Sequence, residues 1–307
     1  MKIILFANTD WYLYNFRLAL AQALKKQGHE VLLVSPSGEY GLKLQEMGFR
    51  WLPFAFSRRG LNPVSEVITL LRLEHLYRHE KPDLVHHFTI KCVLYGSFAA
   101  RRVGVPRVVN SITGLGYVFI SQSVKARLIR WLVSRWYRMA LRGTDVIFQN
   151  PEDKQLFLSY RFTDEQHSYL IPGSGVDIKR FFPCEETTGM PVVVLPARLL
   201  WDKGVGEFVE AARILRAEGI RARFALVGKI DGDNPAAIPI NQLTAWQKEE
   251  VVEWWGWQED IAAVYAQAHI VCLPSYREGM PRVLAEAGAS GRPVVATDVL
   301  ALNPCAS

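Results

Sequence analysis

Residues 2–35 read KIILFANTDWYLYNFRLALAQALKKQGHEVLLVS, and this stretch decides the fold class. It begins with a short apolar strand over 2–7, continues with helical spacing over 13–27 and ends in a second apolar strand over 30–35. Gly28 lies just past the helical stretch, where glycine commonly ends a helix. A strand, a helix and a strand in this order predict two parallel strands joined by a crossover helix.

The same alternation continues along the rest of the chain. Further strands are predicted over 83–87, 107–110, 145–149, 191–196, 223–228, 251–254, 269–273 and 293–297. Helices are predicted over 64–79, about 93–103, 121–142, 205–218, 261–268 and 281–290. We therefore expect an α/β protein with two Rossmann-like domains, 1–171 and 191–307, joined by a linker over 172–190. The carboxyl-end edges of the two sheets should face a central cleft that binds ligands.

The composition excludes several protein classes. Half of the 307 residues are hydrophobic and 21% are charged, which rules out a disordered, collagen-like or coiled-coil chain. The four cysteines stand far apart, with no C-x-x-C pair and no histidine spaced to share a metal, so we expect reduced thiols and no metal site. No apolar run approaches the ~18 residues of a spanning helix, and the first is too short for a signal peptide. We expect a cytoplasmic protein that does not cross a membrane.

The net charge of +6 is unevenly distributed. Residues 1–170 hold 23 Lys and Arg against 13 Asp and Glu, whereas residues 171–307 hold 13 against 17. A basic first half predicts contact with something anionic, whether nucleic acid, a membrane surface or a phosphorylated substrate. Two domains of different surface composition are the alternative.

Three common catalytic or nucleotide-binding motifs are absent from the sequence. The first strand is not followed by G-x-G-x-x-G, so the pyrophosphate of NAD or FAD could not approach a helix start there. The P-loop pattern and the G-x-S-x-G nucleophile elbow are missing as well. An oxidoreductase, a P-loop enzyme and an α/β-hydrolase are therefore disfavoured.

A first charged motif follows a predicted strand of the second half. LPARLLWDKG (195–204) places Arg198 after the strand and Lys203 at the start of the next helix. Two cations beside free helix N–H groups can bind a diphosphate. A solvated loop that happens to carry an Arg and a Lys is the alternative.

A second charged motif follows a later strand. LPSYREGMPRVLAEA (273–287) places Glu278 in a loop and Glu286 in the following helix, with Gly279 and Met280 next to Glu278. Two carboxylates above free N–H groups can bind polyol hydroxyls and phosphate oxygens. A solvated helix residue is the alternative for Glu286, although its neighbours are apolar and an unpaired charge is unfavourable there.

The second motif carries a family resemblance. The E-x7-E pair inside PSYREGMPRVLAEAGASGRPVVATD (274–298) resembles glycosyltransferase family 4, which has the GT-B fold, and so do ARLLWDKG (197–204) and IPGSGVD (171–177). WYLYNFR (11–17), HHFTIK (86–91) and NSITGLGYVF (110–119) resemble its bacterial branch. That branch extends polyprenyl-diphosphate-linked sugars in O-antigen, capsule, lipopolysaccharide and glycan assembly. The resemblance covers residues 1 to about 299.

The resemblance implies a retaining transfer of a hexose or N-acetylhexosamine from a UDP-sugar to a lipid-diphosphate-linked saccharide. Arg198 and Lys203 would bind the donor diphosphate, together with the N–H groups of Gly279 and Met280. Glu286 would bind the ribose, and Glu278 would be the catalytic residue, at the donor sugar hydroxyls near the reacting carbon. No cofactor or metal is implied, because the two cations take the charge that Mg²⁺ would otherwise neutralise.

The sequence departs from the family pattern in two places. Many relatives have a histidine where this chain has Thr113. After residue 299 the family usually continues with a further strand and helices, whereas this chain ends at 307, so we expect an incomplete second domain with exposed apolar surface. An inactive remnant that only binds nucleotide is therefore an alternative. A UDP-N-acetylglucosamine 2-epimerase-like isomerase on the same fold is another.

The acceptor side of the reaction is expected in the first domain. His86, His87 and Lys91 come at or after a buried strand and should line the cleft, where one histidine could accept a proton from the incoming hydroxyl. Asn15 and Arg17 in the first strand–helix connection are further candidates, together with Thr113. A structural role is the alternative for each histidine.

A basic amphipathic helix is predicted over 121–142. One face carries five arginines with Trp131, and the other carries apolar residues that include Trp136 and Met139. This pattern is typical of a helix at an anionic membrane surface. The arginines are Arg127, Arg130, Arg135, Arg138 and Arg142. A core-facing helix with a solvated basic face is the alternative, and nucleic acid is disfavoured because no nucleic-acid motif accompanies it.

Overall fold

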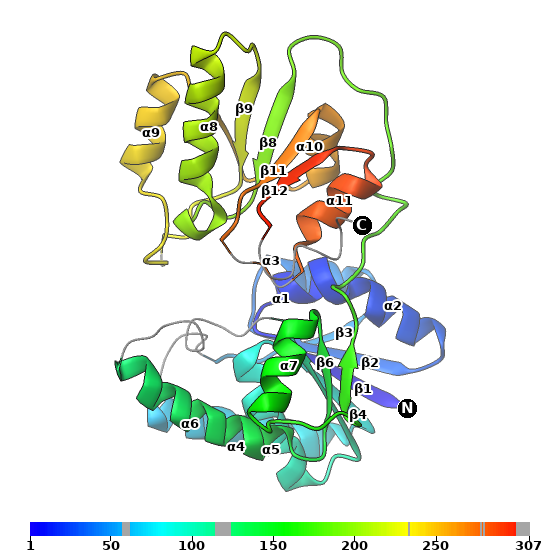
Figure 1. Cartoon of the computed structure of the whole chain (residues 1–307). Helices are drawn as coiled ribbons and strands as arrows, with labels where there is room; N and C mark the ends of the chain where they lie inside the picture. The colour runs from blue at the N-terminus through cyan, green and yellow to red at the C-terminus, as the bar shows by residue number, and fades with distance from the viewer. Residues whose placement is uncertain (57–61, 114–123, 233, 277, 279, 299–307) are drawn as a thin grey trace. The chain divides into compact units, whose positions relative to one another are not determined.

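A computed structural model describes residues 1–56, 62–113, 124–232, 234–276, 278 and 280–298, and only the helical backbone of 124–132. The chain divides into two compact units, Met1–Ser174 and Gly175–Ser307. The division falls inside the predicted linker 172–190. Each unit has its own parallel sheet covered by helices (Figure 1), which is the predicted fold class.

The first unit contains a seven-stranded parallel sheet in the order β3-β2-β1-β4-β5-β6-β7. The strands are β1 (Lys2–Phe6), β2 (Glu30–Ser35), β3 (Arg50–Pro53), β4 (Leu84–Phe88), β5 (Arg107–Ile112), β6 (Asp145–Phe148) and β7 (Ser168–Leu170). The strand order reverses between β1 and β4, because β1 connects to β2 on one side and pairs with β4 on the other. A doubly wound sheet opens a crevice at such a switch point.

Helices cover both faces of this sheet. They are α1 (Asp10–Tyr12), the π-helical turn η1 (Leu13–Arg17), α2 (Leu18–Lys26), α3 (Glu39–Glu46), α4 (Pro63–Glu80), α5 (Ile90–Val103), α6 (Val124–Leu141) and α7 (Pro151–Ser159). On β1, Ile3 and Leu5 pack with α2 and α3, whereas Ile4 and Phe6 pack with α4 and α5. Strand side chains alternate between faces, so a sheet covered on both faces needs the continuous apolar run seen at residues 3–6.

The second unit has a five-stranded parallel sheet in the order β10-β9-β8-β11-β12. Its strands are β8 (Val192–Pro196), β9 (Arg223–Val227), β10 (Glu253–Gly256), β11 (Ile270–Leu273) and β12 (Val294–Ala296). The helices are the 3-10 turn η3 (Trp201–Lys203), α8 (Val205–Ala217), α9 (Ile240–Lys248), α10 (Ile261–Gln267) and α11 (Arg282–Ala289). Helices α8 and α9 pack on one face, and α10 and α11 on the other. The order reverses between β8 and β11, which gives this unit a switch point of its own.

Each predicted strand and helix has a counterpart in the structure, but the structure differs from the prediction in two respects. The predicted helix over 13–27 is divided, because its first turn is the π-helical η1. The elements α3, β3, α7, β7 and α9 were not predicted. At the edge strand β12, Val294 and Val295 are 43% and 57% exposed.

Glu80 ties the end of α4 to the strands β1 and β3, and it gives a pH prediction. Burial alone would raise the pKa of Glu80, but hydrogen bonds from Arg50 (2.6 and 2.7 Å) and Lys2 outweigh it and lower this pKa to about 2. The unfolded pKa is about 4.3. The stabilisation is therefore complete above that pH and is lost as the pH falls to about 2.

We expect Glu80→Gln to lower the free energy of unfolding of the first unit at pH 7 by about 2–3 kcal/mol. Urea titrations of both proteins at several pH values between 7 and 2 measure the difference. The difference in unfolding free energy between the two proteins should shrink steadily as the pH is lowered and should vanish near pH 2. A difference that stays constant with pH would show that the carboxylate charge is not what stabilises this contact.

Candidate functional site

The charged motifs of the second unit meet at its switch point. The loop after β8 carries Lys203 and the loop after β11 carries Glu278, and these two strands are neighbours in the sheet. The Lys203 Nζ atom lies 2.5 Å from Glu278 Oε1, with side chains 19% and 14% exposed. Two residues 75 positions apart in the sequence thus form an ion pair at the carboxyl-end edge, where ligands bind in open α/β sheets.

Gly204 explains why the two loops come so close. Its φ is +71°, and a Cβ atom there would lie 2.1 Å from the Pro274 carbonyl oxygen. Only glycine allows both the left-handed backbone and this contact. The Tyr276 N–H donates a hydrogen bond of 3.1 Å to the Asp202 carbonyl and joins the same loops. The glycine at the end of LWDKG therefore positions Lys203 beside Glu278.

Arg198 lies in the same loop as Lys203 but has a different partner. Its Nη1 atom is 3.1 Å from Asp231 Oδ2, and its side chain is 57% exposed. An exposed ion pair of this kind contributes little energy, so the Arg198 guanidinium can change partners when an anion arrives. The structure does not join Arg198 to Glu278 directly.

Glu286 is buried in the contact between α10 and α11. Tyr265 donates a hydrogen bond of 3.1 Å to one carboxylate oxygen, and Arg282 Nε lies 2.7 Å from the other. Burial raises the pKa of Glu286, while Arg282 and Tyr265 act in the opposite direction. The solvated-helix alternative for Glu286 is therefore wrong. Met280 is half-buried just before α11, and Gly279 lies outside the described residues.

His87 corrects a prediction. It lies inside β4 and is fully buried, so it does not line a cleft. The Asn110 side-chain oxygen accepts a hydrogen bond of 2.9 Å from Nδ1, which leaves Nε2 to accept from Tyr77 at 3.0 Å. Burial lowers the pKa of His87 to about 4. Because neighbouring strand residues point to opposite faces, His86 and His87 cannot share one role.

His86 lies on the other face of β4, next to Arg17. Its Nε2 is 2.8 Å from Ser111 Oγ, and its ring packs on Phe88 with centroids 4.2 Å apart. Burial lowers the pKa of His86 well below its usual value, and the positive charge of Arg17 adds to the effect. The imidazole is therefore neutral at pH 7 and can exchange hydrogen bonds with an uncharged hydroxyl group.

The other predicted acceptor residues are dispersed around the carboxyl-end edge of the first sheet. Asn15 donates a hydrogen bond of 3.0 Å to the Trp11 carbonyl within its own helical turn. Lys91 forms an ion pair of 2.7 Å with Glu66. Thr113 is half-buried directly after β5. The structure therefore places Arg17 beside His86.

The described part of helix α6 exposes the arginines that were predicted to be exposed, and it also exposes two apolar side chains. Arg135, Arg138 and Arg142 are exposed, whereas the side chains of Arg127, Arg130 and Trp131 lie outside the described residues. The prediction placed Trp136 and Met139 on the apolar face, but they are 44% and 47% exposed. Tyr137, Ala140 and Leu141 fill the core instead, because within residues 133–141 these side chains pack with residues of α5, β6 and α7.

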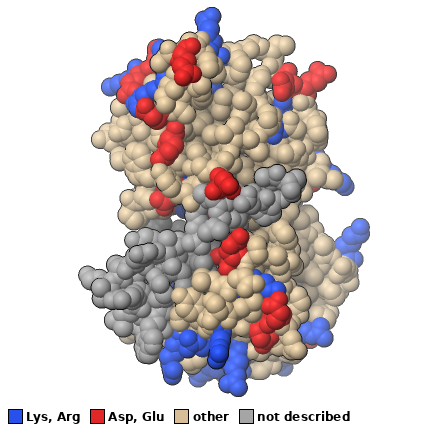
Figure 2. All heavy atoms as spheres, viewed as in Figure 1, with Lys and Arg blue, Asp and Glu red and all other residues tan. Residues whose placement is uncertain are grey.

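An exposed apolar stripe on α4 was not predicted as a surface. Val64, Val67, Ile68 and Leu71 repeat at the helical spacing and are between 43% and 67% exposed. In sequence such a stripe looks like a core face, and only the packing of α4 reveals that it points outward. Figure 2 shows basic side chains gathered at the side of the first unit where Figure 1 places α4, α5 and α6.

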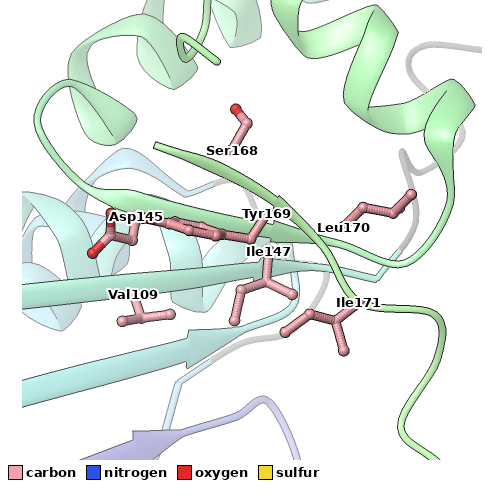
Figure 3. A pocket seen from close by; sticks show the side chains of 7 residues that line it. All are labelled: Val109, Asp145, Ile147, Ser168, Tyr169, Leu170 and Ile171. Atoms are coloured by element: carbon pink, nitrogen blue, oxygen red, sulfur yellow. The ribbon is translucent and has the colours of Figure 1, made fainter. Parts of the chain in front are cut away.

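A hollow of about 460 Å³ lies over the β5–β6–β7 part of the first sheet (Figure 3). Ile147, Tyr169 and Ile171 give it a mainly apolar lining, with Asp145 at one end. Such a lining does not suit a nucleotide or a sugar, which need polar partners. Among the residues that the structure describes, no group of His, Cys, Asp or Glu could hold a metal ion. Within that part of the chain, no helix is long and apolar enough to cross a membrane.

Comparison with known proteins identifies the family. The family model described as "Glycosyl transferase 4-like" matches residues 2–160, more than half of the chain. The chain belongs to this family. A second model, "Glycosyl transferases group 1", matches residues 190–305 in the second unit. The protein is therefore a glycosyltransferase, as the resemblance of its motifs implied.

Two relatives of this glycosyltransferase act on lipid-linked sugars according to their names. N,N'-diacetylbacillosaminyl-diphospho-undecaprenol alpha-1,3-N-acetylgalactosaminyltransferase of Campylobacter jejuni is 29% identical over 97% of this chain and 81% of its own length. UDP-Gal:alpha-D-GlcNAc-diphosphoundecaprenol alpha-1,3-galactosyltransferase of Escherichia coli is 28% identical over 78% of this chain. The matched region is 64% of that second relative.

Solved structures show the fold of this glycosyltransferase. Anabaena HepE in complex with UDP aligns with a TM-score of 0.73 at 18% identity, over 98% of this chain and 82% of HepE. WaaG, a glycosyltransferase involved in lipopolysaccharide biosynthesis, aligns with a TM-score of 0.71 at 16% identity, over 99% of this chain and 83% of WaaG. The predicted GT-B fold of two Rossmann-like domains is confirmed.

Proposed function

We propose that this glycosyltransferase moves a hexose or N-acetylhexosamine from a UDP-sugar to a lipid-diphosphate-linked saccharide, with retention of configuration and without a metal. The observation that carries the proposal is the Lys203–Glu278 pair at the switch point of the second unit. The names of the two relatives described above contain diphospho-undecaprenol or diphosphoundecaprenol, and they support the acceptor class.

The ion pair is arranged for an exchange of partners. Without a donor, Lys203 and Glu278 neutralise each other at 2.5 Å. An incoming diphosphate binds the Lys203 ammonium and, from the rim, the Arg198 guanidinium, since charge-assisted bonds to phosphate are strong. Glu278 then becomes available to accept hydrogen bonds from the sugar hydroxyls. The two cations stabilise the charge that develops on the departing UDP, so the proposal needs no metal.

Glu286 and His86 complete the proposed roles. Glu286 accepts hydrogen bonds from the ribose hydroxyls, and Tyr265 together with Arg282 fixes the orientation of its carboxylate. On the acceptor side, the neutral His86 orients the incoming hydroxyl, with Thr113 close to the same edge. His87 has no part in this proposal, because its ring is bonded inside the core.

The first unit provides the proposed membrane contact on the cytoplasmic side. The exposed side of α6 combines Arg135 and Arg138 with Trp136 and Met139, and the exposed Arg142 follows directly after the helix. Arginines attract anionic lipid headgroups, while an exposed Trp enters the interfacial layer. The apolar stripe of α4 adds exposed apolar area on the same unit. Peripheral attachment would bring the lipid-linked acceptor to the enzyme.

Replacing Arg127, Arg130, Arg135, Arg138 and Arg142 together by Gln should release the protein from anionic vesicles. Each surface-near basic residue contributes about 1 kcal/mol at low salt. Added salt should release the parent only partly, because screening leaves the apolar contribution intact. Vesicle co-sedimentation at low and high salt measures both effects, and UDP binding should be unchanged.

A matched control removes five positive charges elsewhere. Lys25, Lys26, Lys81, Arg107 and Arg161 are exposed residues of the first unit outside α6. Their joint replacement by Gln changes the net charge equally but should leave most of the protein on the vesicles. Equal release by both variants would show that net charge, rather than α6, determines membrane binding.

Product analysis with and without an acceptor tests the proposed reaction. The full chain is incubated with a panel of UDP- and other nucleotide sugars, first alone and then with a prenyl-diphosphate-linked saccharide. Transfer predicts a lengthened lipid product that forms only when the acceptor is present. An altered sugar without acceptor would indicate the epimerase-like alternative, and UDP binding without any turnover would indicate the inactive remnant.

A further inference from the structure

Arg17 is a buried cation at the end of the π-helical turn η1. Its side chain is 9% exposed, and its Nη2 donates a hydrogen bond of 2.7 Å to the Tyr12 hydroxyl. The guanidinium lies over the Phe88 ring, 4.4 Å from the centroid, and 5.4 Å from that of Tyr12. Its Nε–H is buried and has no hydrogen-bond partner. One donor of this guanidinium is therefore unsatisfied.

No carboxylate neutralises Arg17 in the described part of the first unit. Asp10, the acid nearest in sequence, accepts the N–H groups of Tyr40 and Gly41 at 2.8 and 2.9 Å. The residues of this unit whose side chains are not described, 57–61 and 114–132, contain no Asp or Glu. A buried charge without a counter-charge is unfavourable, and aromatic rings compensate only part of that cost. The missing partner is therefore an anion from outside the first unit.

The position of Arg17 in the fold fits a ligand site. Its turn follows β1, and Phe88 ends the neighbouring strand β4, so both lie at the switch point of the first sheet. After β1 the chain passes to the face of the sheet covered by α2, whereas after β4 it passes to the opposite face, covered by α5. Because the two connections diverge, a crevice opens between the ends of β1 and β4. The extra residue of a π-helical turn is itself a feature that often marks functional sites.

The groups around Arg17 restrict what can bind. His86 is neutral and bonded to Ser111, so Arg17 supplies a positive charge that no charged neighbour in contact with it opposes. The planar guanidinium favours an oxyanion with two oxygens in one plane. A phosphate group has this geometry, whereas a cation or an apolar chain would leave the buried charge unpaired.

We infer that Arg17 binds a phosphate oxygen through its Nε–H and is the anion-binding residue of the first unit. The origin of that phosphate rests on the proposed function: it is the diphosphate of the lipid-linked acceptor or the diphosphate of the donor. Arg17 acts as a positioning residue, because it fixes the phosphate while the sugar and the acceptor hydroxyl react elsewhere.

NMR of arginine Nε–H groups tests the contact in the full chain. The Arg17 signal is assigned by its absence from the Arg17→Lys spectrum. UDP is added to saturation first, followed by a short prenyl diphosphate, with inorganic pyrophosphate as a separate probe. A shift of the signal with UDP assigns the donor phosphate, and a shift only with the prenyl diphosphate assigns the acceptor. A signal that no probe moves overturns the inference.

Calorimetry of the variants gives an independent measure. Arg17→Gln should weaken one binding step about tenfold to a hundredfold. That step is UDP binding if the phosphate is the donor's, and it is pyrophosphate or prenyl-diphosphate binding to the UDP-saturated protein if the phosphate is the acceptor's. Arg17→Lys should weaken it less, since the charge is kept and only the planar fork is lost. Arg107→Gln removes an exposed cation at the first residue of β5, at the sheet edge opposite to the one that carries Arg17, and should have no effect. Unchanged affinity of Arg17→Gln for UDP, pyrophosphate and prenyl diphosphate, with a normal melting curve, would overturn the inference.

The two proposals can fail separately. If the chain transfers no sugar but the Arg17 signal still responds to pyrophosphate or prenyl diphosphate, the proposed reaction is wrong and the phosphate site stands. If transfer is intact and Arg17→Gln changes neither phosphate binding nor the KM of the acceptor, the reaction stands and the role of Arg17 is wrong. Should Arg17→Gln not fold, the NMR titration of the parent protein decides.

Discussion

Lys203→Gln is expected to lower kcat/KM for the nucleotide-sugar donor about a hundredfold to a thousandfold, the usual effect of losing one group that stabilises developing charge. The change removes the cation assigned to the diphosphate. It also leaves the carboxylate of Glu278, only 14% exposed, without its partner at the place where the diphosphate should bind. Initial transfer rates at several donor concentrations measure the effect.

Two companion variants show whether the effect is specific. Lys248→Gln removes an exposed lysine at the end of α9 in the same unit and should leave the rate unchanged. The double variant Lys203→Gln/Glu278→Gln should lower kcat/KM by less than the product of the two single reductions, because each residue acts partly through the other. A Lys203→Gln rate within a factor of about two of the parent would contradict the assigned diphosphate contact.

Glu286→Ala is expected to weaken UDP binding about tenfold to a hundredfold, since hydrogen bonds to a charged group are worth roughly 1.5–3 kcal/mol each. The ribose loses its carboxylate partner, and Tyr265 and Arg282 lose the group that they orient. Calorimetric titration with UDP measures the change. A thermal melt of each variant separates weaker binding from partial unfolding.

The control for Glu286 is an exposed carboxylate of the same unit. Glu210→Ala breaks only the surface pair of 3.1 Å with Arg213 and should bind UDP like the parent. Glu286→Gln should keep the hydrogen bond from Tyr265 but lose the charge, and so it should fall between the parent and the Ala variant. Equal UDP affinity of Glu286→Ala and the parent would contradict the ribose contact.

The long elements of both sheets could be predicted because their apolar runs are buried on both faces. Five of the shorter elements, α3, β3, α7, β7 and α9, could not. Helix α3 has eight residues and contains Gly41, whose position against the Trp51 ring leaves no room for a Cβ atom. Strand β7 has three residues, two of them exposed. Such segments depend on tertiary contacts more than on local propensity, which the sequence pattern does not show.

The candidate site divides in the same way. The meeting of Lys203 and Glu278 follows from two loops at the ends of neighbouring parallel strands, which strand order makes close. The contacts of Glu286 depend on how α10 packs against α11, and the outward turn of Trp136 depends on which arc of α6 meets the sheet. Neither can be read from spacing. The unpaired burial of Arg17 is visible only once its possible partners have positions.

Mass spectrometry of the lipid acceptor tests the central claim most directly. A prenyl-diphosphate-linked saccharide in anionic vesicles is incubated with the full chain and each UDP-sugar in turn, in the presence of a chelator. The account predicts that one donor adds the mass of a single sugar to the acceptor, and that Lys203→Gln abolishes most of this product. No sugar added from any donor, by a folded protein that sediments with the vesicles, would contradict it.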